Sequence, residues 1–177
     1  AVGEEPIAEW LPFYLDPEEL VNYTLNKRLR PATVPMDIRE MYIEHALLRA
    51  GIRHMLADAR LNWKSLPLYG DMPPIGLIIG AGATLTGTGY SALDMLLMVD
   101  AIQPTGVTHI KADPHGVIPA LGALSLREPN AVVQLVDDEV LDHLGTVISV
   151  SGNPSVGSTA IKLKITTDDG EEFEHEI

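Results

Sequence analysis

The residues best suited to ligand chemistry are glycines and threonines near the middle of the chain. A short apolar run at residues 75–79 predicts a strand, and Gly80, Ala81 and Gly82 follow it at once. A helix is predicted from about residue 91, so the glycines form a tight turn between a strand and a helix. In an α/β sheet such a turn presents backbone N–H groups to a bound molecule. No other segment suggests a small-molecule site as clearly.

The glycine turn does not match two standard phosphate-binding motifs. Leu85 stands where the dinucleotide fingerprint needs its third glycine. The P-loop needs a lysine after its last glycine, and no lysine lies between Lys64 and Lys111. The turn and the hydroxyls of Thr84, Thr86 and Thr88 remain. From these residues alone, a tight turn without a ligand is as reasonable an interpretation as a binding site.

Composition excludes several classes of protein. The 177 residues carry a formal net charge of −13, which argues against binding to nucleic acid or to an anionic membrane surface. The absence of cysteine excludes disulfides, thiolate metal sites and a cysteine nucleophile. No apolar run reaches the roughly 20 residues of a membrane span. We therefore expect a cytoplasmic protein, and the sequence leaves its oligomeric state open.

Two helices are predicted before the glycine turn. Asp16 is placed to cap a helix that begins at Pro17 and ends before Pro31. Asp37 is placed to cap a long helix over residues 38–60. Spacings of three and four give this helix one buried stripe of six residues. The stripe consists of Met41, His45, Leu48, Ile52, Met55 and Ala59.

The elements around the turn alternate between strand and helix. After the strand at 75–79 we predict a helix at 91–101, a strand at 106–111 and a helix at 115–126. The order β-α-β-α predicts parallel strands. Residues 1–128 are therefore predicted to form an α/β domain with a mostly parallel sheet.

Residues 129–177 are predicted to form a small acidic β subdomain. With the two residues before them they carry eleven Asp or Glu and three Lys or Arg. The predicted strands cover residues 131–136, 145–150, 159–165 and 171–177, with a hairpin turn at 168–170. The chain starts at Ala1 without a methionine and stops within a strand pattern, so we expect a truncated subdomain and a fragment of a longer protein.

The remaining polar residues give no catalytic or metal-binding pattern. The six histidines show no paired ligand spacing. His45 is interpreted as a hydrogen-bonded core residue and His115 as part of a helix entry. Lys27 lies in the only basic cluster and complements the end of a helix, with an anionic ligand as the alternative. We predict no catalytic residue and no metal ligand in this chain.

The segment from the glycine turn to residue 125 resembles the second half of the actin-like ATPase fold. In that superfamily a glycine turn packs on the adenosine, and a helix opens after an Asp-Pro turn, here Asp113 and Pro114. Ala120, Gly122 and Ala123 match the small residues that let this helix approach the sheet closely. Glu44 and Arg49 precede the strand on the long helix. The resemblance suggests that they hold adenine, although a solvated face is the favoured interpretation.

The chain also resembles the accessory proteins of glutamate mutase (methylaspartate mutase). This family is often labelled MutL and is unrelated to the DNA-repair protein of that name. The resemblance covers about residues 16–165. The matching segments are residues 26–35, 78–85, 100–108, 118–124 and 144–148.

The resemblance implies an ATP-dependent, chaperone-like partner of an adenosylcobalamin-dependent mutase. It implies nucleotide contacts at Gly80, Ala81, Gly82, Ala83 and Thr84, and at Asp113. ATP with Mg²⁺ would bind only in the complete protein, because the superfamily's first phosphate loop does not occur in this chain. The fragment alone is therefore expected not to hydrolyse ATP. Two alternatives are a non-catalytic interaction module with an unoccupied glycine turn and an unrelated α/β enzyme.

Overall fold

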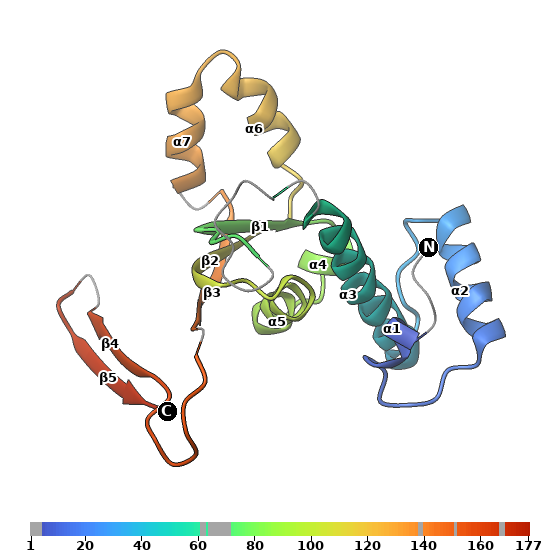
Figure 1. The fold of residues 1–177 in the computed structure, drawn as a ribbon. Coiled ribbons are helices and arrows are strands. Elements are labelled where there is room, and N and C mark those ends of the chain that lie inside the picture. Colours follow the sequence, from blue (N-terminus) through green and yellow to red (C-terminus); the bar gives the residue numbers. More distant parts are fainter. Residues whose placement is uncertain (1–4, 61–62, 64–71, 138–139, 151, 167–168) are drawn as a thin grey trace.

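The computed structural model describes residues 5–60, 63, 72–137, 140–150, 152–166 and 169–177. It has a mixed α/β fold, with helices gathered around a small mixed sheet and a separate two-stranded hairpin (Figure 1). None of the described helices is both long enough and apolar enough to cross a membrane.

The N-terminal part is helical. Its helices are α1 (Glu5–Ala8), α2 (Pro17–Leu29) and α3 (Ile38–Arg60). Both predicted helix starts are confirmed. Asp16 Oδ1 accepts the Glu18 N–H at 2.8 Å. Asp37 Oδ1 accepts the Glu40 N–H, also at 2.8 Å. In both cases the carboxylate satisfies an N–H that has no partner within the helix.

The buried face of α3 is not the predicted stripe. His45 is buried as expected, but Met55 is 63% exposed. The buried residues are Ile43, Glu44, His45, Ala46 and Ala50. They lie in the first half of the helix, where α1 and α2 supply Ile7 and Leu20 to a shared core and α5 packs from another side. Helical spacing alone could not show that α3 has neighbours on two sides.

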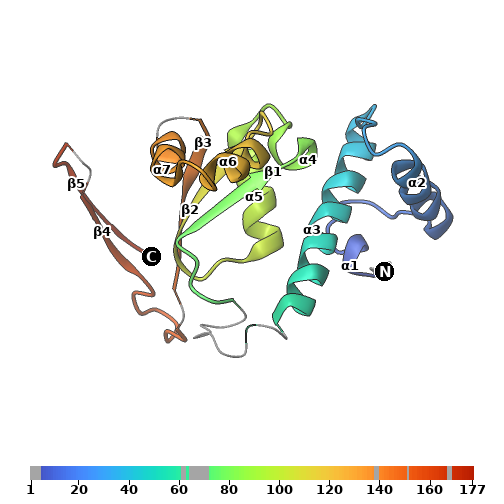
Figure 2. The ribbon, with the colours of Figure 1, turned by 90° about the horizontal axis from the view of Figure 1, so that it is seen from above.

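The central sheet has the order β1-β2-β3. Its elements are β1 (Leu77–Ala81), α4 (Ala83–Thr86), α5 (Ser91–Ile102), β2 (Gly106–Asp113) and β3 (Asp142–Ser149). β1 and β2 are parallel, as predicted, and β1 begins two residues later than expected. Helix α5 covers one face of the sheet, where Met98 packs on Ile110 and Ala112 (Figure 2).

The region between β2 and β3 contains the helix predicted at 115–126 but differs from the prediction after it. It contains α6 (Ile118–Ser125) and α7 (Pro129–Asp137), which pack against each other. The predicted strand at 131–136 is wrong, since these residues belong to α7. The run of valines favours a strand, but Pro129 opens a helix and half-buried Val132 and Val136 lie one turn apart.

The sheet extends beyond residue 128, the boundary that we predicted between two domains. β3 pairs antiparallel with β2, so it belongs to the sheet of the glycine turn. Only β4 (Lys162–Thr166) and β5 (Glu172–Glu176) form a separate antiparallel hairpin. Asp169 and Gly170 lie in the predicted turn of this hairpin, and Asp168 lies outside the described residues.

Candidate functional site

The glycine turn has the backbone geometry that its sequence predicts. Gly82 has φ 100° and ψ 143°, in the region that favours glycine, and it turns the chain from β1 into α4. The carbonyl of Gly82 accepts the N–H of Leu85 at 2.9 Å. Ala83 and Thr84 therefore lie in a short helix that sequence analysis missed. Ala81 is the last residue of β1 and pairs with Asp113 of β2.

Gly80 has a packing role. It lies in β1, and a Cβ at this position would collide with the side chain of Met98 on α5. We expected the close approach of a helix at Ala120, Gly122 and Ala123, but no residue of α6 is buried. The close approach between helix and sheet is therefore at Gly80, because α5 rather than α6 covers the sheet.

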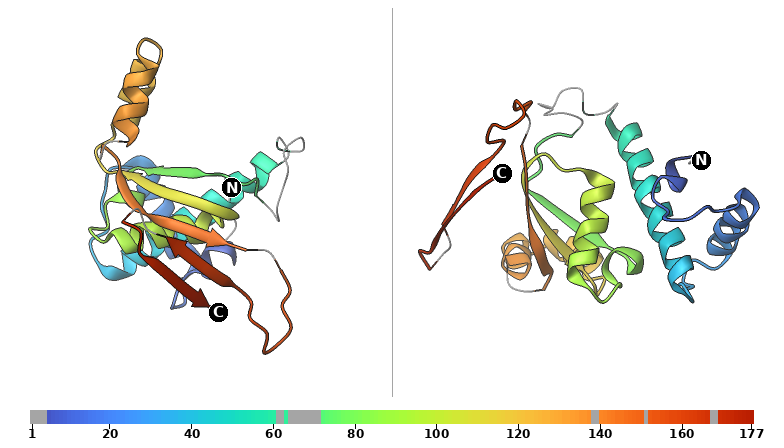
Figure 3. Two further views of the ribbon diagram at one scale, coloured as in Figure 1. Left: turned by 90° about the vertical axis from the view of Figure 1, so that its left-hand side faces the viewer. Right: turned by 90° about the horizontal axis from the view of Figure 1, so that it is seen from below.

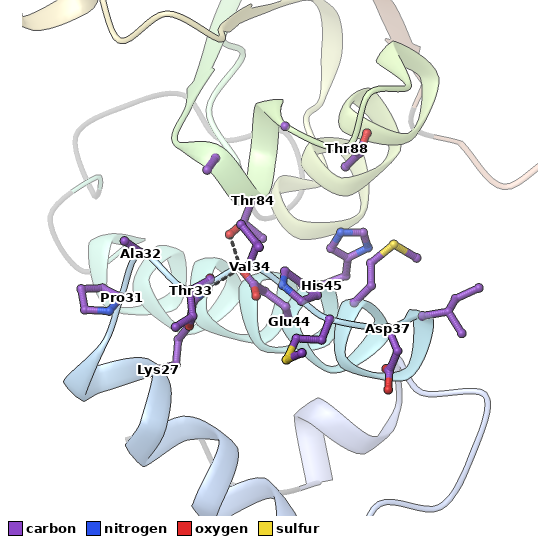
Figure 4. A pocket seen from close by; sticks show the side chains of 16 residues that line it. Lys27, Pro31, Ala32, Thr33, Val34, Asp37, Glu44, His45, Thr84 and Thr88 are labelled. Carbon is purple, nitrogen blue, oxygen red and sulfur yellow. Dashed lines mark hydrogen bonds and ion pairs between the residues drawn. The ribbon is translucent and has the colours of Figure 1, made fainter.

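A cavity of about 580 Å³ lies beside the glycine turn (Figure 4). Its walls are the loop between α2 and α3, the first half of α3, and the segment from α4 to Thr88. The lining residues are Lys27, Pro31, Ala32, Thr33, Val34, Pro35, Met36, Asp37, Ile38, Met41, Glu44, His45, Ala83, Thr84, Gly87 and Thr88. Apolar side chains form much of the wall, and a few polar groups converge at one end, as in many small-molecule sites.

Glu44 is the centre of the polar end. Its side chain accepts hydrogen bonds from Thr84 Oγ1 at 2.6 Å, Lys27 Nζ at 2.9 Å and Tyr23 Oη at 3.0 Å. Burial favours the neutral acid, but the bonds from Lys27, Thr84 and Tyr23 outweigh it and lower the pKa of Glu44. Glu44 is therefore ionised at neutral pH and joins α2, α3 and α4.

The same carboxylate changes its neighbour Tyr23. Burial, and then the negative charge of Glu44, raise the pKa of this phenol above its ordinary value of 10.0. Tyr23 therefore keeps its proton at neutral pH and remains a hydrogen-bond donor to Glu44.

His45 is the second buried polar residue of the wall. Only 6% of it is exposed. Its ring points from α3 toward the segment that carries Thr88 (Figure 4). Burial, and then the charge of Arg49, hold the pKa of His45 below 6.5, so the imidazole is neutral at pH 7. We expected a hydrogen bond to this ring, and none is found among the described residues. Close by, Thr88 Oγ1 donates to Asp94 Oδ1 at 2.7 Å.

Asp113 stabilises the start of α6. Its Oδ1 accepts the Val117 N–H and its Oδ2 accepts the Ile118 N–H, both at 2.9 Å. Burial opposes ionisation of Asp113, but the backbone N–H groups of residues 115–118 outweigh it and lower its pKa. Both oxygens thus serve the helix entry that the Asp-Pro pair predicts, and Asp113 does not line the cavity.

The favoured interpretation of Glu44 and Arg49 as a solvated face is wrong. Glu44 is 7% exposed. Arg49 is half-buried, with Nη2 2.9 Å from Asp100 Oδ2 and its guanidinium 5.0 Å from the centre of the Trp10 ring. The alternative, that Glu44 and Arg49 hold adenine, stays a prediction; Glu44 does lie beside the glycine turn, where it bonds to Thr84. Arg49 does not line the cavity.

The rest of the cavity wall was not predicted from the sequence. The charge of Lys27 was noted, but its ion pair with Glu44 was not predicted, because the two residues lie 17 positions apart in the sequence. The loop at 31–37 gave no chemical signal of its own. Among the described residues, no group of three or more Asp, Glu or His side chains is placed to hold a metal ion.

Compared with protein-family models, curated proteins and solved structures, this chain gives no significant match. The site is therefore interpreted from its own geometry.

Proposed function

We propose that this chain forms the adenosine-side wall of a nucleotide cleft in a cytoplasmic, actin-like ATP-binding protein that assists a cobalamin-dependent mutase. The observation that carries the proposal is the bond between Thr84 and Glu44 at the cavity. It brings together the glycine turn and the long helix, the two segments for which the sequence resemblance implies adenosine contacts. The mutase partner depends on the resemblance alone.

The cavity suits a nucleoside in size and chemistry. Its volume of about 580 Å³ lies within the ordinary range for small-molecule sites. Val34, Met36 and Met41 offer apolar surface to a planar base. Glu44 Oε1 accepts two hydrogen bonds and Oε2 accepts one, which leaves Oε2 able to accept another from a sugar hydroxyl.

The phosphates and Mg²⁺ would be held mainly by groups outside this wall. Lys27 is the cation that lines the cavity, and its Nζ is already paired with Glu44. Asp113 is engaged with α6. The proposal therefore assigns base and sugar recognition to this chain and phosphate chemistry to the opposite wall of the cleft.

Calorimetric titration with ATP tests the proposal, using the complete protein and this chain in parallel. We expect the complete protein to bind more tightly than the chain. Replacing Glu44 by Gln should weaken binding by the complete protein about tenfold, the value of one hydrogen bond to a charged group. The matched control is Glu19→Gln, an exposed carboxylate paired with Arg39 outside the cavity.

A second candidate is a non-catalytic interaction module with an unoccupied turn. It is favoured by the three internal donors, which already occupy most of the acceptor positions of Glu44. Millimolar or weaker ATP binding by both the complete protein and this chain would exclude the nucleotide proposal and leave this candidate. Thr84→Val separates the two further, since it should weaken nucleotide binding only if the cavity is a ligand site.

A further inference from the structure

One face of the central sheet is uncovered in the described part of the chain. Leu77 of β1, Val107 of β2 and Ile148 of β3 share this face and are 41%, 57% and 39% exposed. Their neighbours along each strand point the other way, toward α5, where Met98 and Ile110 are fully buried. Figure 3, left, looks onto the uncovered face, with α5 behind the sheet.

This exposure is unusual for a sheet with a parallel pair. Parallel strands occur almost entirely in sheets whose two faces are both covered. Here α3, α4 and α5 lie on one side only, and α6 and α7 project beyond the strand ends (Figures 1 and 2). Burial stabilises an apolar sheet face. An exposed face of this kind therefore indicates that a second layer packs on it in the assembled protein.

The β4–β5 hairpin carries the complementary feature. Ile165 pairs with Phe173 and Leu163 with His175, so these four side chains share one face. Phe173 is 53% exposed. The two strands pack chiefly against each other. A two-stranded hairpin in water is marginal by itself, so this apolar face also lacks a covering layer.

The other face of the hairpin is charged and needs no cover. Lys162 pairs with Glu176 and Lys164 with Glu172, at 2.8 and 2.9 Å, and all four side chains are more than half exposed. The hairpin is thus amphipathic: its charged face contacts solvent, and no other described element covers its apolar face.

The sheet face and the hairpin as a whole differ in the sign of their charge. The uncovered sheet face carries Lys111, His109 and His143. Lys111 Nζ donates to the carbonyl of Val136 at 2.7 Å, which leaves its charge without a carboxylate partner in that contact. The described part of the hairpin has two lysines against five carboxylates. Glu172, Glu174 and Glu176 lie on the face of the hairpin opposite Phe173, so apolar contact joins the two surfaces and the charge of the hairpin acts only at longer range.

We propose that two copies of this chain associate by exchanging hairpins, each β4–β5 hairpin packing its apolar face on the uncovered sheet face of the other copy. The hairpin stands apart from its own sheet on the uncovered side (Figure 2), a position from which it can reach a second molecule. Two layers of sheet packed about 10 Å apart would bury both apolar faces at once. A two-fold arrangement makes both contacts identical, and this is the commonest symmetry of oligomers.

Single-cysteine variants test the contact directly, because the natural chain has no cysteine. Val107→Cys and Phe173→Cys each place one exposed thiol on one of the two surfaces. Mixed under mild oxidation, the two variants should form a disulfide-linked heterodimer in higher yield than either variant forms homodimers. Val21→Cys, exposed on α2, replaces Phe173→Cys in the control mixture and should give no preferred link.

Light scattering during size-exclusion chromatography measures the association itself. At about 0.15 M salt, which screens the repulsion between two chains of net charge −13, we expect a concentration-dependent dimer. Phe173→Ser should weaken it at least about tenfold, as expected for a central aromatic contact, and Val21→Ser should not. Circular dichroism checks that each variant is folded.

Three outcomes would overturn the proposal. One is a monomer at every concentration. Another is an intramolecular link in the double variant Val107→Cys/Phe173→Cys at high dilution, which would show that the hairpin closes on its own sheet. The third is a dimer that Phe173→Ser leaves unchanged, which would place the interface elsewhere.

Discussion

The structure contains two lysine–glutamate pairs with the same separation in different surroundings. Lys27 and Glu44 lie 2.9 Å apart at the cavity, with side chains 25% and 9% exposed. Lys164 and Glu172 lie 2.9 Å apart on the β4–β5 hairpin, with side chains 54% and 56% exposed. Distance alone therefore does not rank the two interactions. Burial does, because water screens the exposed second pair more strongly than the first.

The two pairs also differ in what they connect. The pair at the cavity joins α2 to α3, and Thr84 extends the contact to α4. The pair on the hairpin joins two strands that are already hydrogen-bonded neighbours. Loss of the first pair therefore disturbs three elements, whereas loss of the second leaves the ladder in place.

The largest expected effect comes from Glu44→Leu. It leaves Lys27, Tyr23 and Thr84 without their shared acceptor, and breaking a buried pair from one side costs about 3 kcal/mol of unfolding free energy. Urea denaturation measures the loss. A loss below about 1 kcal/mol would mean that water reaches the cavity end freely, and the contrast between the two pairs would fail.

The next largest loss of stability is expected at a glycine that packs against α5, compared with a glycine that has free space beside it. Gly80→Ala places a methyl group against Met98 and should cost about 1–2 kcal/mol of unfolding free energy through overpacking. Gly76→Ala is the matched control, since no atom lies within 4 Å of its added Cβ. Equal denaturation midpoints for the two variants would contradict this cost and show that the end of the Met98 side chain moves away from the added methyl group.

A smaller effect concerns pH. In the unfolded chain His45 titrates near 6.5 and takes up a proton more readily than in the folded chain, where its pKa is lowered by burial and then by Arg49. The free energy of unfolding should therefore decrease as the pH falls below 6.5, until the folded form is protonated as well. His45→Gln should reduce this decrease.

Urea midpoints at about pH 7.5 and about pH 5.5 measure the effect of His45. His54→Gln, exposed on the same helix, controls for the loss of an imidazole. If His45→Gln and the natural chain lose the same stability between these two pH values, His45 does not contribute to the change.

The smallest effect is expected on the hairpin. Glu172→Gln should change the free energy of unfolding by less than about 0.5 kcal/mol, because the pair is exposed. The difference should vanish at about 1 M salt, where exposed charges are screened. A loss as large as that of Glu44→Leu would show that the charged face of the hairpin is buried in an assembly.

Prediction from sequence succeeded where the signal was local. The caps at Asp16 and Asp37 act on N–H groups two and three residues away. The turn at Gly82 needs only a residue that tolerates positive φ. The parallel pairing of β1 and β2 follows from a helix between two apolar runs.

Prediction failed where distant contacts decided the outcome. Residues 131–136 have strand-like composition, but in the structure they form a helix that packs on α6. β3 was expected in a separate subdomain, but its hydrogen bonds are with β2. Neither segment carries a local signal for its partner, and the strand-like composition of residues 131–136 outweighed the helix start at Pro129 in the prediction.

The sequence by itself determined where helices begin, where the chain turns at glycine, and that a strand, a helix and a second strand follow one another. These features depend on backbone conformation and on groups a few positions apart. Only the tertiary structure decided that Glu44 would be ionised beside Thr84, 40 residues away along the chain, and that none of the described elements would cover one face of the sheet. Burial and ion pairing depend on which surfaces meet, and that is fixed only when the whole chain has packed.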